Sequence, residues 1–405
     1  MTGEHMPFPS FFRRSAIVLL VFLAFGCDKL LTTSTDDTTA SPMDNPPSIM
    51  AAFARGDEQF ARIFRVSEGL GPVFNQPSCE TCHPGDGRGT PQTILKRFSI
   101  NGDLVPKLGG PQLQDRAIPG VPPETIPAGA EVSVRMPPPV FGRGLMEMIP
   151  AATIIALEDP DDLDGDGISG RVNWVQPADF VPSIMMGAGP GLAVGRFGLK
   201  ANVSSLLHQI VAAYHDDMGI TTDFQPEESL HPLVGDLSLS DVAPDPELPG
   251  TEVLDVLMYI RTLAVPPRGE LTDQVQRGDA MFEQIGCASC HVPNLKTGPS
   301  AIPSLNMVDA PLYSDMLLHD LGEELADHRA DGSANGFEWR TVPLMGLRLA
   351  ADNLGGTVHY LHDGRTSDLS EAILIHGGEA QASRDRFNAL SAEESEAVLA
   401  FLLSL

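Results

Sequence analysis

Basic side chains are scarce in this chain. Its 405 residues include 26 lysines and arginines against 54 aspartates and glutamates, which gives a formal net charge of -28. Nucleic acids and anionic membrane surfaces are therefore excluded as partners, because both would be repelled. The acidity either keeps the chain soluble or steers a basic protein partner toward it.

Long apolar runs are also missing, apart from one near the N-terminus. Residues 16–25 are apolar and follow Arg13 and Arg14. This run is too short for a permanent membrane-spanning helix, and its basic flank is typical of an export signal. We therefore expect a signal segment over residues 1–27 and a mature protein in the periplasm or cell envelope.

Residues 23–27 resemble a bacterial lipoprotein cleavage site, although Phe25 is bulky for that pattern. The sequence thus leaves two outcomes open: a lipid anchor on Cys27, or simple cleavage nearby. Residues 28–47 are rich in Thr, Ser, Asp and Pro and cannot bury a core, so they predict a flexible linker.

The chain has only five cysteines, and apart from Cys27 they form two C-x-x-C pairs. Each pair is followed at once by a histidine, in Cys79-Glu-Thr-Cys82-His83 and in Cys287-Ala-Ser-Cys290-His291. This is the spacing of c-type haem attachment, in which two thiols bind one porphyrin edge and the histidine ligates the iron. The sequence therefore predicts two covalently bound c-type haems.

A single four-thiolate zinc site, or two redox-active disulfides, would also account for the cysteines. Neither alternative explains why a histidine directly follows each pair. With 11 histidines in the chain, chance places one at both positions about once in 1000. An export signal also agrees with haem attachment, because c-type haem is joined to the unfolded chain outside the cytoplasm.

Two internal repeats divide the chain into related halves. Arg-Gly-Asp-Glu-Gln-Phe at residues 55–60 and Arg-Gly-Asp-Ala-Met-Phe at 277–282 each precede a haem motif. Pro-Val-Phe-Gly-Arg-Gly-Leu at 139–145 and Pro-Leu-Met-Gly-Leu-Arg-Leu at 343–349 each follow one. The chain is therefore expected to contain two related haem units.

Helical signals exceed strand signals. Apolar residues recur at helical spacing over residues 203–214, and Ser-Ala-Glu-Glu at 391–394 is a capping box that opens a final helix. We expect a mainly α fold with two cytochrome-c-like haem domains. The first spans residues 48–265 and carries a large loop-rich insertion, and the second spans residues 266–405. His208 falls on the middle helix, where packing is its expected role.

With these motifs in place, the chain resembles the bacterial di-haem oxidoreductase family, whose members are described as peroxidases and also as thiol oxidoreductases. The resemblance covers nearly all of residues 50–405. It rests on Gly-Leu-Gly-Pro-Val-Phe-Asn at 69–75, Asp-Gly-Arg-Gly at 86–89, Gly-Pro-Gln-Leu-Gln-Asp-Arg at 110–116, Gly-Asp-Gly-Ile-Ser-Gly-Arg at 165–171, Asp-Met-Gly-Ile-Thr at 217–221 and Tyr-Leu-His-Asp-Gly-Arg at 360–365. More distantly, the family is similar to the di-haem cytochrome c peroxidases and to the di-haem enzyme that matures tryptophan-derived quinone cofactors.

The distant resemblance implies a second axial ligand for the C-terminal haem. In the peroxidases a methionine ligand follows the histidine of a Tyr-Phe-His-(Asp/Ser)-Gly motif by fourteen residues. Counted from His362, that position is His376, so the resemblance implies ligation by His291 and His376. His362 and Met345 are rival ligands, and a histidine that only caps a helix end is the alternative. A second imidazole makes this haem easier to oxidise than a thioether would, as suits an electron relay.

The N-terminal haem lacks an obvious second ligand. No histidine occurs between His83 and His208, whereas the cytochrome c peroxidases have a removable histidine ligand shortly after their first motif. We therefore expect an iron that is open on its distal side or capped by Met136, Met146 or water. An open iron can bind peroxide, whose cleavage then needs a group that moves a proton.

Glu147 and Arg135 are the candidates for catalysis at this haem. Glu147 lies about where the peroxidases hold their acid-base glutamate, and an exposed helix glutamate is the alternative. Arg135 either stabilises negative charge on peroxide or, as we prefer, pairs with a haem propionate.

An acidic run with alternating oxygen donors predicts a calcium site. Asp162, Asp164, Asp166 and the backbone of Ile168, with a glycine for the turn, match the first half of a calcium loop. Asn173 stands where such loops carry a glutamate, so an Asp/Gly-rich turn without metal is the alternative.

These features together predict a peroxidase-like di-haem oxidoreductase. Electrons from a small cytochrome or cupredoxin would enter at the His291 haem, pass to the His83 haem and reduce hydrogen peroxide there. Trp174 and Trp339, the only tryptophans, either bridge the haems or pack in the core. An electron-transfer cytochrome without catalysis, and an oxidase of a protein side chain or thiol, are the alternative functions.

Overall fold

The computed structural model describes residues 1–2, 45–182, 191–233, 243–354 and 356–405. The predicted export signal beyond residue 2, Cys27 and most of the predicted linker lie outside these ranges. Within them, no helix has both the length and the apolar character needed to cross a bilayer.

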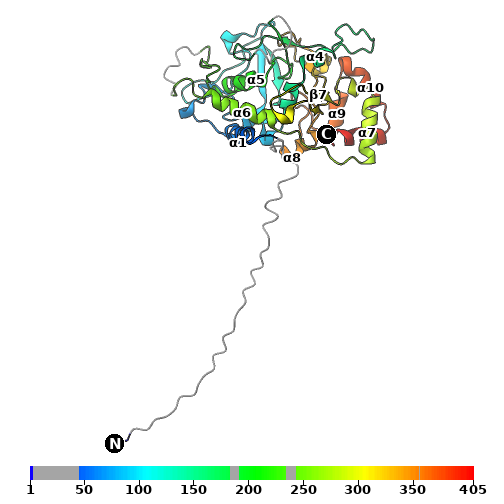
Figure 1. Ribbon diagram of the computed structural model, residues 1–405. Helices are drawn as coiled ribbons and strands as arrows, with labels where there is room; N and C mark the ends of the chain where they lie inside the picture. The colour runs from blue at the N-terminus through cyan, green and yellow to red at the C-terminus, as the bar shows by residue number, and fades with distance from the viewer. Residues whose placement is uncertain (3–44, 183–190, 234–242, 355) are drawn as a thin grey trace. The chain divides into compact units, whose positions relative to one another are not determined.

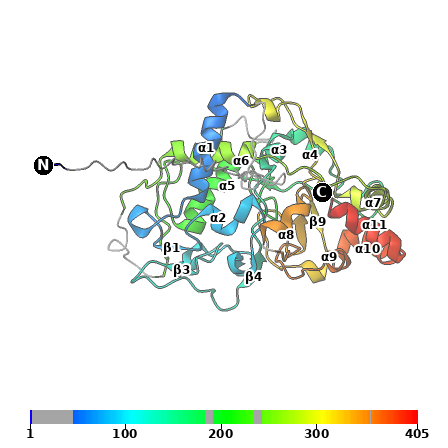
Figure 2. The same cartoon turned by 90° about the horizontal axis from the view of Figure 1, so that it is seen from below.

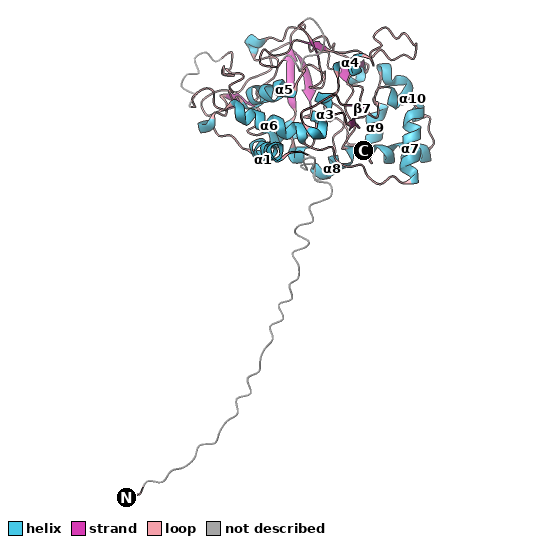
Figure 3. Cartoon of the chain, in the orientation of Figure 1, coloured by secondary structure: helices cyan, strands magenta, loops and turns pink. Residues whose placement is uncertain are grey.

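Helices supply most of the regular structure in the described ranges, as the sequence predicts (Figure 3). The longer ones are α1 (Pro47–Ala61), α6 (Gly250–Thr262), α7 (Asp273–Gln284), α10 (Gln381–Asn388) and α11 (Ala392–Leu402). The shorter ones are α2 (Cys79–Cys82), α3 (Arg143–Met148), α4 (Ala151–Ile155), α5 (Leu206–Ala212), α8 (Ala350–Asn353) and α9 (Leu369–Leu374). The capping box predicted at Ser391 opens α11, where Ser391 Oγ accepts a hydrogen bond from the backbone N–H of Glu394.

The sheets of the described ranges are all two-stranded and antiparallel. The pairs are β1 (Val73–Phe74) with β3 (Arg116–Ala117), β2 (Leu95–Ser99) with β4 (Glu131–Arg135), β5 (Trp174–Val175) with β6 (Ala193–Val194), β7 (Leu295–Lys296) with β8 (Asp309–Ala310), and β9 (Leu318–Asp320) with β10 (Glu338–Arg340). Long loops connect these elements, so most of the chain between α2 and α5 is irregular (Figure 3).

The repeated Arg-Gly-Asp segments place a glycine at a close helix crossing in each half. α1 packs along α6, and α7 packs along α11 (Figures 1 and 2). A Cβ atom on Gly56 would lie 2.1 Å from the carbonyl oxygen of Asp255, and one on Gly278 would lie 1.9 Å from the carbonyl oxygen of Ala397. Since no side chain fits at either crossing, glycine permits both helix pairs to approach closely.

Each cysteine pair adjoins its own apolar cluster. Cys79 packs against a cluster that includes Phe60, and Cys287 packs against another that includes Phe282. These phenylalanines are equivalent in the repeat, and their ring centroids lie 6.2 Å and 6.3 Å from the histidine rings of the two motifs. The first cluster also takes in Met345, which lies beyond the expected domain boundary at residue 265.

The second pair of repeats meets across the two halves. A Cβ atom on Gly142 would lie 2.6 Å from Sδ of Met345, and one on Gly346 would lie 2.3 Å from the ring of Phe141. Phe141-Gly142 and Met345-Gly346 occupy the same positions in their repeats. The contacts are therefore reciprocal, as in a two-fold symmetric interface, and both glycines have the positive φ that such a turn requires (66° and 74°).

Candidate haem sites

The first cysteine pair forms a single helical turn, α2, beside a cavity of about 340 Å³. Ser78 caps this turn by accepting a hydrogen bond from the backbone N–H of Thr81 (3.2 Å). Cys79, Cys82 and His83 all line the cavity. Burial lowers the pKa of His83 to about 4, so its imidazole is neutral and able to ligate a metal ion.

Several polar side chains interrupt the largely apolar wall of this first cavity. They include Gln76, Arg97, Gln112, Arg135, Arg143, His208, Asp216, Asp217 and Arg340. His208 therefore lies at the cavity and not simply in a packed core. Burial lowers the pKa of His208, and its Nδ1 makes no hydrogen bond within the described ranges. The imidazole is thus a neutral group available to a ligand or a proton.

Of the two methionines considered as weak iron ligands, Met136 lies at the first cavity. It is 1% exposed, and a Cβ atom on Gly364 would lie 2.3 Å from its Cε atom. Met146 does not line the cavity; its sulfur lies 3.0 Å from Nη1 of Arg143.

Three of the stretches that carry the family resemblance meet in one polar cluster at the first cavity. Nε2 of Gln112 donates a very short hydrogen bond to Oδ1 of Asp217 and another to Oδ1 of Asn75 (3.2 Å). The backbone N–H of Asn75 in turn donates to the carbonyl of Asp217 (2.7 Å). Distant parts of the chain thus fix the position of one buried carboxyl group.

Asp217 has two properties of a functional carboxylate. It ends a π-helical turn, Ala213–Asp217, and such turns occur frequently at functional sites. Burial raises the pKa of Asp217 to about 7, although the hydrogen bond from Gln112 opposes this. No role was predicted for Asp217, and only its place in the 217–221 stretch marked it in the sequence.

Glu147, the predicted acid-base residue, lies in α3 and does not line the first cavity. It is not an exposed helix glutamate either, because it is only 8% exposed. Its Oε2 accepts a hydrogen bond from Nε of Arg261 (2.6 Å), and its Oε1 accepts one from the backbone N–H of Leu206 (2.9 Å). Both carboxylate oxygens are therefore engaged in joining α3 to α5 and α6.

Arg135, the other predicted catalytic residue, lies at the end of β4 and does line the first cavity. Its Nη1 pairs with Oδ2 of Asp331 at 2.7 Å, and its Nε donates to Oγ of Ser133 at 2.9 Å. The guanidinium is thus held in a fixed position beside the cavity.

The second cysteine pair borders a cavity of about 240 Å³ with mainly apolar walls, which His291 and His376 both line. Nδ1 of His291 donates to the carbonyl of Tyr313 (2.9 Å), and Nδ1 of His376 donates to the carbonyl of Ala372 (2.7 Å). These bonds fix the tautomer and make Nε2 the ligating nitrogen of each ring. Burial lowers the pKa of both histidines, to about 4 for His291, so both imidazoles are neutral.

The rival ligands Met345 and His362 line the second cavity as well. The ring of His362 stacks on Trp339, with centroids 3.8 Å apart and planes 17° apart. Nε1 of Trp339 donates to the carbonyl of Leu325 (2.9 Å), which holds the indole in place. Trp339 borders the second cavity only, and Trp174 in β5 borders neither.

The two cavities share part of a wall, formed by Pro139, Leu199 and Arg340. Arg340 is 2% exposed, and its guanidinium donates to the carbonyls of Thr341 (2.9 Å) and Gly198 (3.2 Å). Groups bound in the two cavities would therefore be close neighbours.

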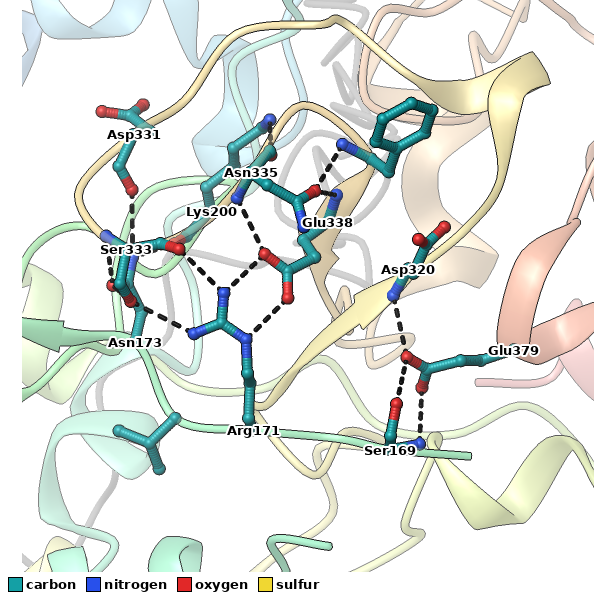
Figure 4. A network of polar contacts seen from close by, with 12 residues as sticks. Ser169, Arg171, Asn173, Lys200, Asp320, Asp331, Ser333, Asn335, Glu338 and Glu379 are labelled. Atoms are coloured by element: carbon teal, nitrogen blue, oxygen red, sulfur yellow. Dashed lines mark hydrogen bonds and ion pairs between the residues drawn. The ribbon is translucent and has the colours of Figure 1, made fainter. Parts of the chain in front are cut away.

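A charged cluster adjoins Cys290 at the second cavity. His319 lies between Asp315 (2.8 Å) and Glu379 (2.7 Å), and its Nδ1 is 3.8 Å from the Cys290 sulfur. Burial alone would lower the pKa of His319, but hydrogen bonds to the two carboxylates raise it to about 12. Glu379 also accepts hydrogen bonds from Ser169, as Figure 4 shows, so this cluster is tied to the loop at 162–169.

The loop predicted to bind calcium reaches the second cavity through Ile168, which lines it. Carboxylate oxygens of Asp159, Asp162 and Asp164 lie within 4.8 Å of one another. Asp166 instead accepts a hydrogen bond from the backbone N–H of Ile168 (2.8 Å). The oxygen cluster thus brings Asp162 and Asp164 together with Asp159, and Asp166 is not a member of it.

The residues at both motifs fit a covalently bound haem. All four cysteines are free thiols, each pair borders its own cavity, and a neutral histidine follows each pair. The two pairs line separate cavities, so they do not come together as a single four-thiolate site.

Comparison with solved structures gives weak similarities. Hydrazine synthase of Kuenenia stuttgartiensis is 15% identical with a TM-score of 0.37, over 90% of this chain and 94% of that chain. A MauG-like protein associated with microbial copper homeostasis is 16% identical with a TM-score of 0.37, over 90% of each chain. Neither score establishes a shared fold.

No curated protein matches the sequence. A family model described as "Di-haem oxidoreductase, putative peroxidase" matches residues 127–405, well over half of the chain. The match includes the second haem motif, whereas the first lies before it. The chain therefore belongs to the di-haem oxidoreductase family.

Proposed function

We propose that this chain reduces hydrogen peroxide at an N-terminal c-type haem, with electrons relayed through a C-terminal c-type haem. Membership of the family supports the part of this proposal that makes the chain a di-haem redox enzyme. Each haem would occupy a cytochrome-c-like domain, residues 48–265 and 266–405, each of which contains one haem motif. Both cavities also take lining residues from the other domain.

The observation that carries the proposal is the difference between the two cavities. The second is mainly apolar and is lined by two neutral histidines whose Nδ1 atoms are already engaged, His291 and His376. Two imidazole ligands suit a haem that only exchanges electrons. The first cavity, although largely apolar too, is also lined by ionisable side chains such as Arg135, His208 and Asp217, as a site that handles protons requires.

Peroxide reduction consumes two electrons and two protons and releases two water molecules. Haem, when bound, supplies the iron that binds peroxide and passes electrons. His83 would hold this iron from the proximal side. The remaining task of the protein is to move a proton between the two oxygens of the substrate.

We assign the proton transfer to Asp217 in place of Glu147. Asp217 borders the first cavity, has a pKa near neutrality and is oriented by Gln112. Such a group can both accept and release a proton at neutral pH. Glu147 lies outside the cavity with both oxygens engaged, so its proposed role is to position α5.

The electron donor would be a small cytochrome or cupredoxin in the periplasm or cell envelope, with Cys27 as a lipid anchor if it is acylated. The net charge of -28 favours a donor with a basic docking face, because opposite charges raise the rate of encounter.

A calcium ion is proposed at the oxygen cluster of Asp159, Asp162 and Asp164. It would stabilise the loop that contacts the second cavity through Ile168 and binds Glu379 through Ser169.

Absorption and EPR spectra of the pure ferric protein test the function. We expect one high-spin haem and one low-spin haem, with peroxide altering the high-spin signal first. A stopped-flow experiment would then measure the rate at which the half-reduced protein reduces peroxide. Two low-spin haems and no reaction with peroxide would contradict the proposal.

That outcome would favour the second candidate function, an electron-transfer cytochrome. The observation that favours it is His208, a neutral histidine at the first cavity that is available as a second axial ligand. A His208→Ala variant separates the two functions, because it would convert a low-spin first haem to high-spin only if His208 ligates the iron.

A further inference from the structure

A set of buried charges lies beside the first cavity and is here called the cationic cluster. Its members are Arg97, Arg135, Lys200, Arg329, Asp327 and Asp331. The side chains of Lys200 and Arg329 are completely buried, and no other member is more than 18% exposed. Four cations thus face two carboxylates, which leaves a surplus of two positive charges.

One carboxylate oxygen serves three guanidinium groups. Oδ2 of Asp331 lies 2.7 Å from Nη1 of Arg135 and 3.1 Å from Nη1 of Arg329. The same oxygen is 3.6 Å from Nε of Arg97, too far for a hydrogen bond. Asp331 therefore cannot satisfy these three groups, and their guanidinium charges hold its pKa well below the usual range although burial opposes this.

The second carboxylate is committed to the lysine. Asp327 lies 2.6 Å from Nζ of Lys200, which also donates to the carbonyls of Arg329 and Asn335 (both 2.8 Å). The other carboxylate oxygen of Asp327, Oδ2, is 3.7 Å from Nη2 of Arg135. Several polar atoms of the cluster make no hydrogen bond of good geometry within the described ranges: Nε of Arg97, Nη2 of Arg135, all three guanidinium nitrogens of Arg329, and the Oδ2 atoms of Asp327 and Asp331.

Burying this surplus is costly unless an anion is present. Burial, helped by neighbouring cations, lowers the pKa of Arg135 to about 10 and that of Lys200 to about 8, although Asp327 and Asp331 oppose both shifts. An uncompensated charge inside a protein costs several kcal/mol. Two additional negative charges would neutralise the cluster.

The cluster opens to the first cavity only through its guanidinium groups. Arg97 and Arg135 line that cavity. The ring of Trp339, which borders the second cavity, lies 4.5 Å from Nζ of Lys200 and 5.8 Å from Cζ of Arg135. Asp217 also lines this cavity and is near enough to sense the charge of Arg97, but forms no salt bridge with it among the described contacts.

We propose that the cationic cluster is the binding site for the two propionate carboxylates of a haem held at the first motif, with Arg97 and Arg135 as the contacting residues. Guanidinium groups pair with carboxylates through two parallel hydrogen bonds, and a porphyrin carries the two negative charges that the cluster lacks. The inference rests on haem attachment at Cys79 and Cys82 but not on peroxide as the substrate.

The test compares Arg135→Gln in two backgrounds: the holoprotein, and a Cys79→Ser/Cys82→Ser variant that lacks the first haem. In the holoprotein the substitution should lower Tm by roughly 5 °C or more, since it leaves buried carboxylates unpaired. It should also shift the midpoint potential of the first haem to more negative values, because a nearby positive charge favours the reduced iron. In the haem-deficient background the same substitution should lower Tm by less than in the holoprotein, or should raise it.

Arg171→Gln is the matched control. It removes the partner of Glu338 (2.6 Å), an ion pair near the cluster that borders neither cavity (Figure 4). Its effect on Tm should be equal in both backgrounds, and neither potential should move. If Arg135→Gln does not fold, the same measurements are made on Arg97→Gln, because Arg97 is a less buried member of the cluster.

Equal losses of Tm for Arg135→Gln in the two backgrounds, with an unchanged first potential, would overturn the inference and leave the cluster as an internal ion network. None of these measurements involves peroxide, so a failure of the peroxidase proposal gives a separate result.

Discussion

Replacing Asp217 by asparagine should make the protein more stable and less active. Burial raises the pKa of Asp217 from 3.8 to about 7, which corresponds to a cost of up to about 4 kcal/mol for the ionised form. A raised pKa means that, as the pH rises, Asp217 keeps its proton to a higher pH in the folded state than in the unfolded state. Stability contributed by this group is therefore complete below about pH 4 and is lost as the pH rises through 7.

Asparagine keeps the size of the side chain and cannot ionise. Asp217→Asn should therefore leave the free energy of unfolding nearly unchanged at pH 4 and raise it by up to about 4 kcal/mol at pH 8. Denaturant unfolding at the two pH values measures this difference.

The same substitution should slow peroxide reduction by roughly a hundredfold or more, the usual scale for loss of a general acid-base group. The parent rate should rise with pH through about 7, because the carboxylate form accepts the proton, and the variant should lose that inflection. Stopped-flow mixing with peroxide gives both results, and the absorption spectrum verifies that both haems are retained.

Glu147→Gln is the paired control. It weakens the ion pair with Arg261 and should cost about 3 kcal/mol of stability, with little effect on the rate of the folded protein. If Glu147→Gln abolishes the peroxide reaction while Asp217→Asn keeps the parental rate and pH profile, the assignment of the proton to Asp217 is refuted.

Four further predictions follow from the sites. Cys79→Ser with Cys82→Ser should leave one haem on a denaturing gel stained for haem, and undiminished staining would contradict attachment there. His376→Met should keep the second haem low-spin and raise its midpoint potential; a potential equal to that of the parent would favour another ligand. Asp164→Ala should remove calcium from protein purified without chelators, and a parent that contains no calcium would exclude the site. Gly278→Ala should cost about 3 kcal/mol in denaturant unfolding because a carbonyl of α11 occupies the space of its methyl group, and a stability equal to the parent's would show that the helices can move apart.

Residues close together in the sequence were informative about helices and haem attachment. The capping box at Ser391 predicted the start of α11, and the apolar periodicity before Tyr214 predicted α5. Both signals arise within one or two helical turns, so they do not depend on the rest of the fold. A single helical turn also places both thiols of the first C-x-x-C-H motif at one cavity.

Side-chain roles that depend on orientation were not predictable in the same way. Glu147 and Asp217 are both carboxylates near helix ends, and no local pattern favoured Asp217 over Glu147. The position of Asp217 at the cavity depends on Gln112 and Asn75, which lie more than a hundred residues earlier in the chain. The orientation of Glu147 depends on Arg261, which follows it by 114 residues.

The sequence by itself determined the helical character and the family, and it predicts the attachment chemistry, because each depends on short contiguous motifs. The tertiary structure alone decided which polar groups share a cavity. Arg97, Arg135 and Asp331 come together although Asp331 lies some two hundred residues beyond the others. A surplus of buried charge arises only when such distant segments pack, since each residue separately would be satisfied by water.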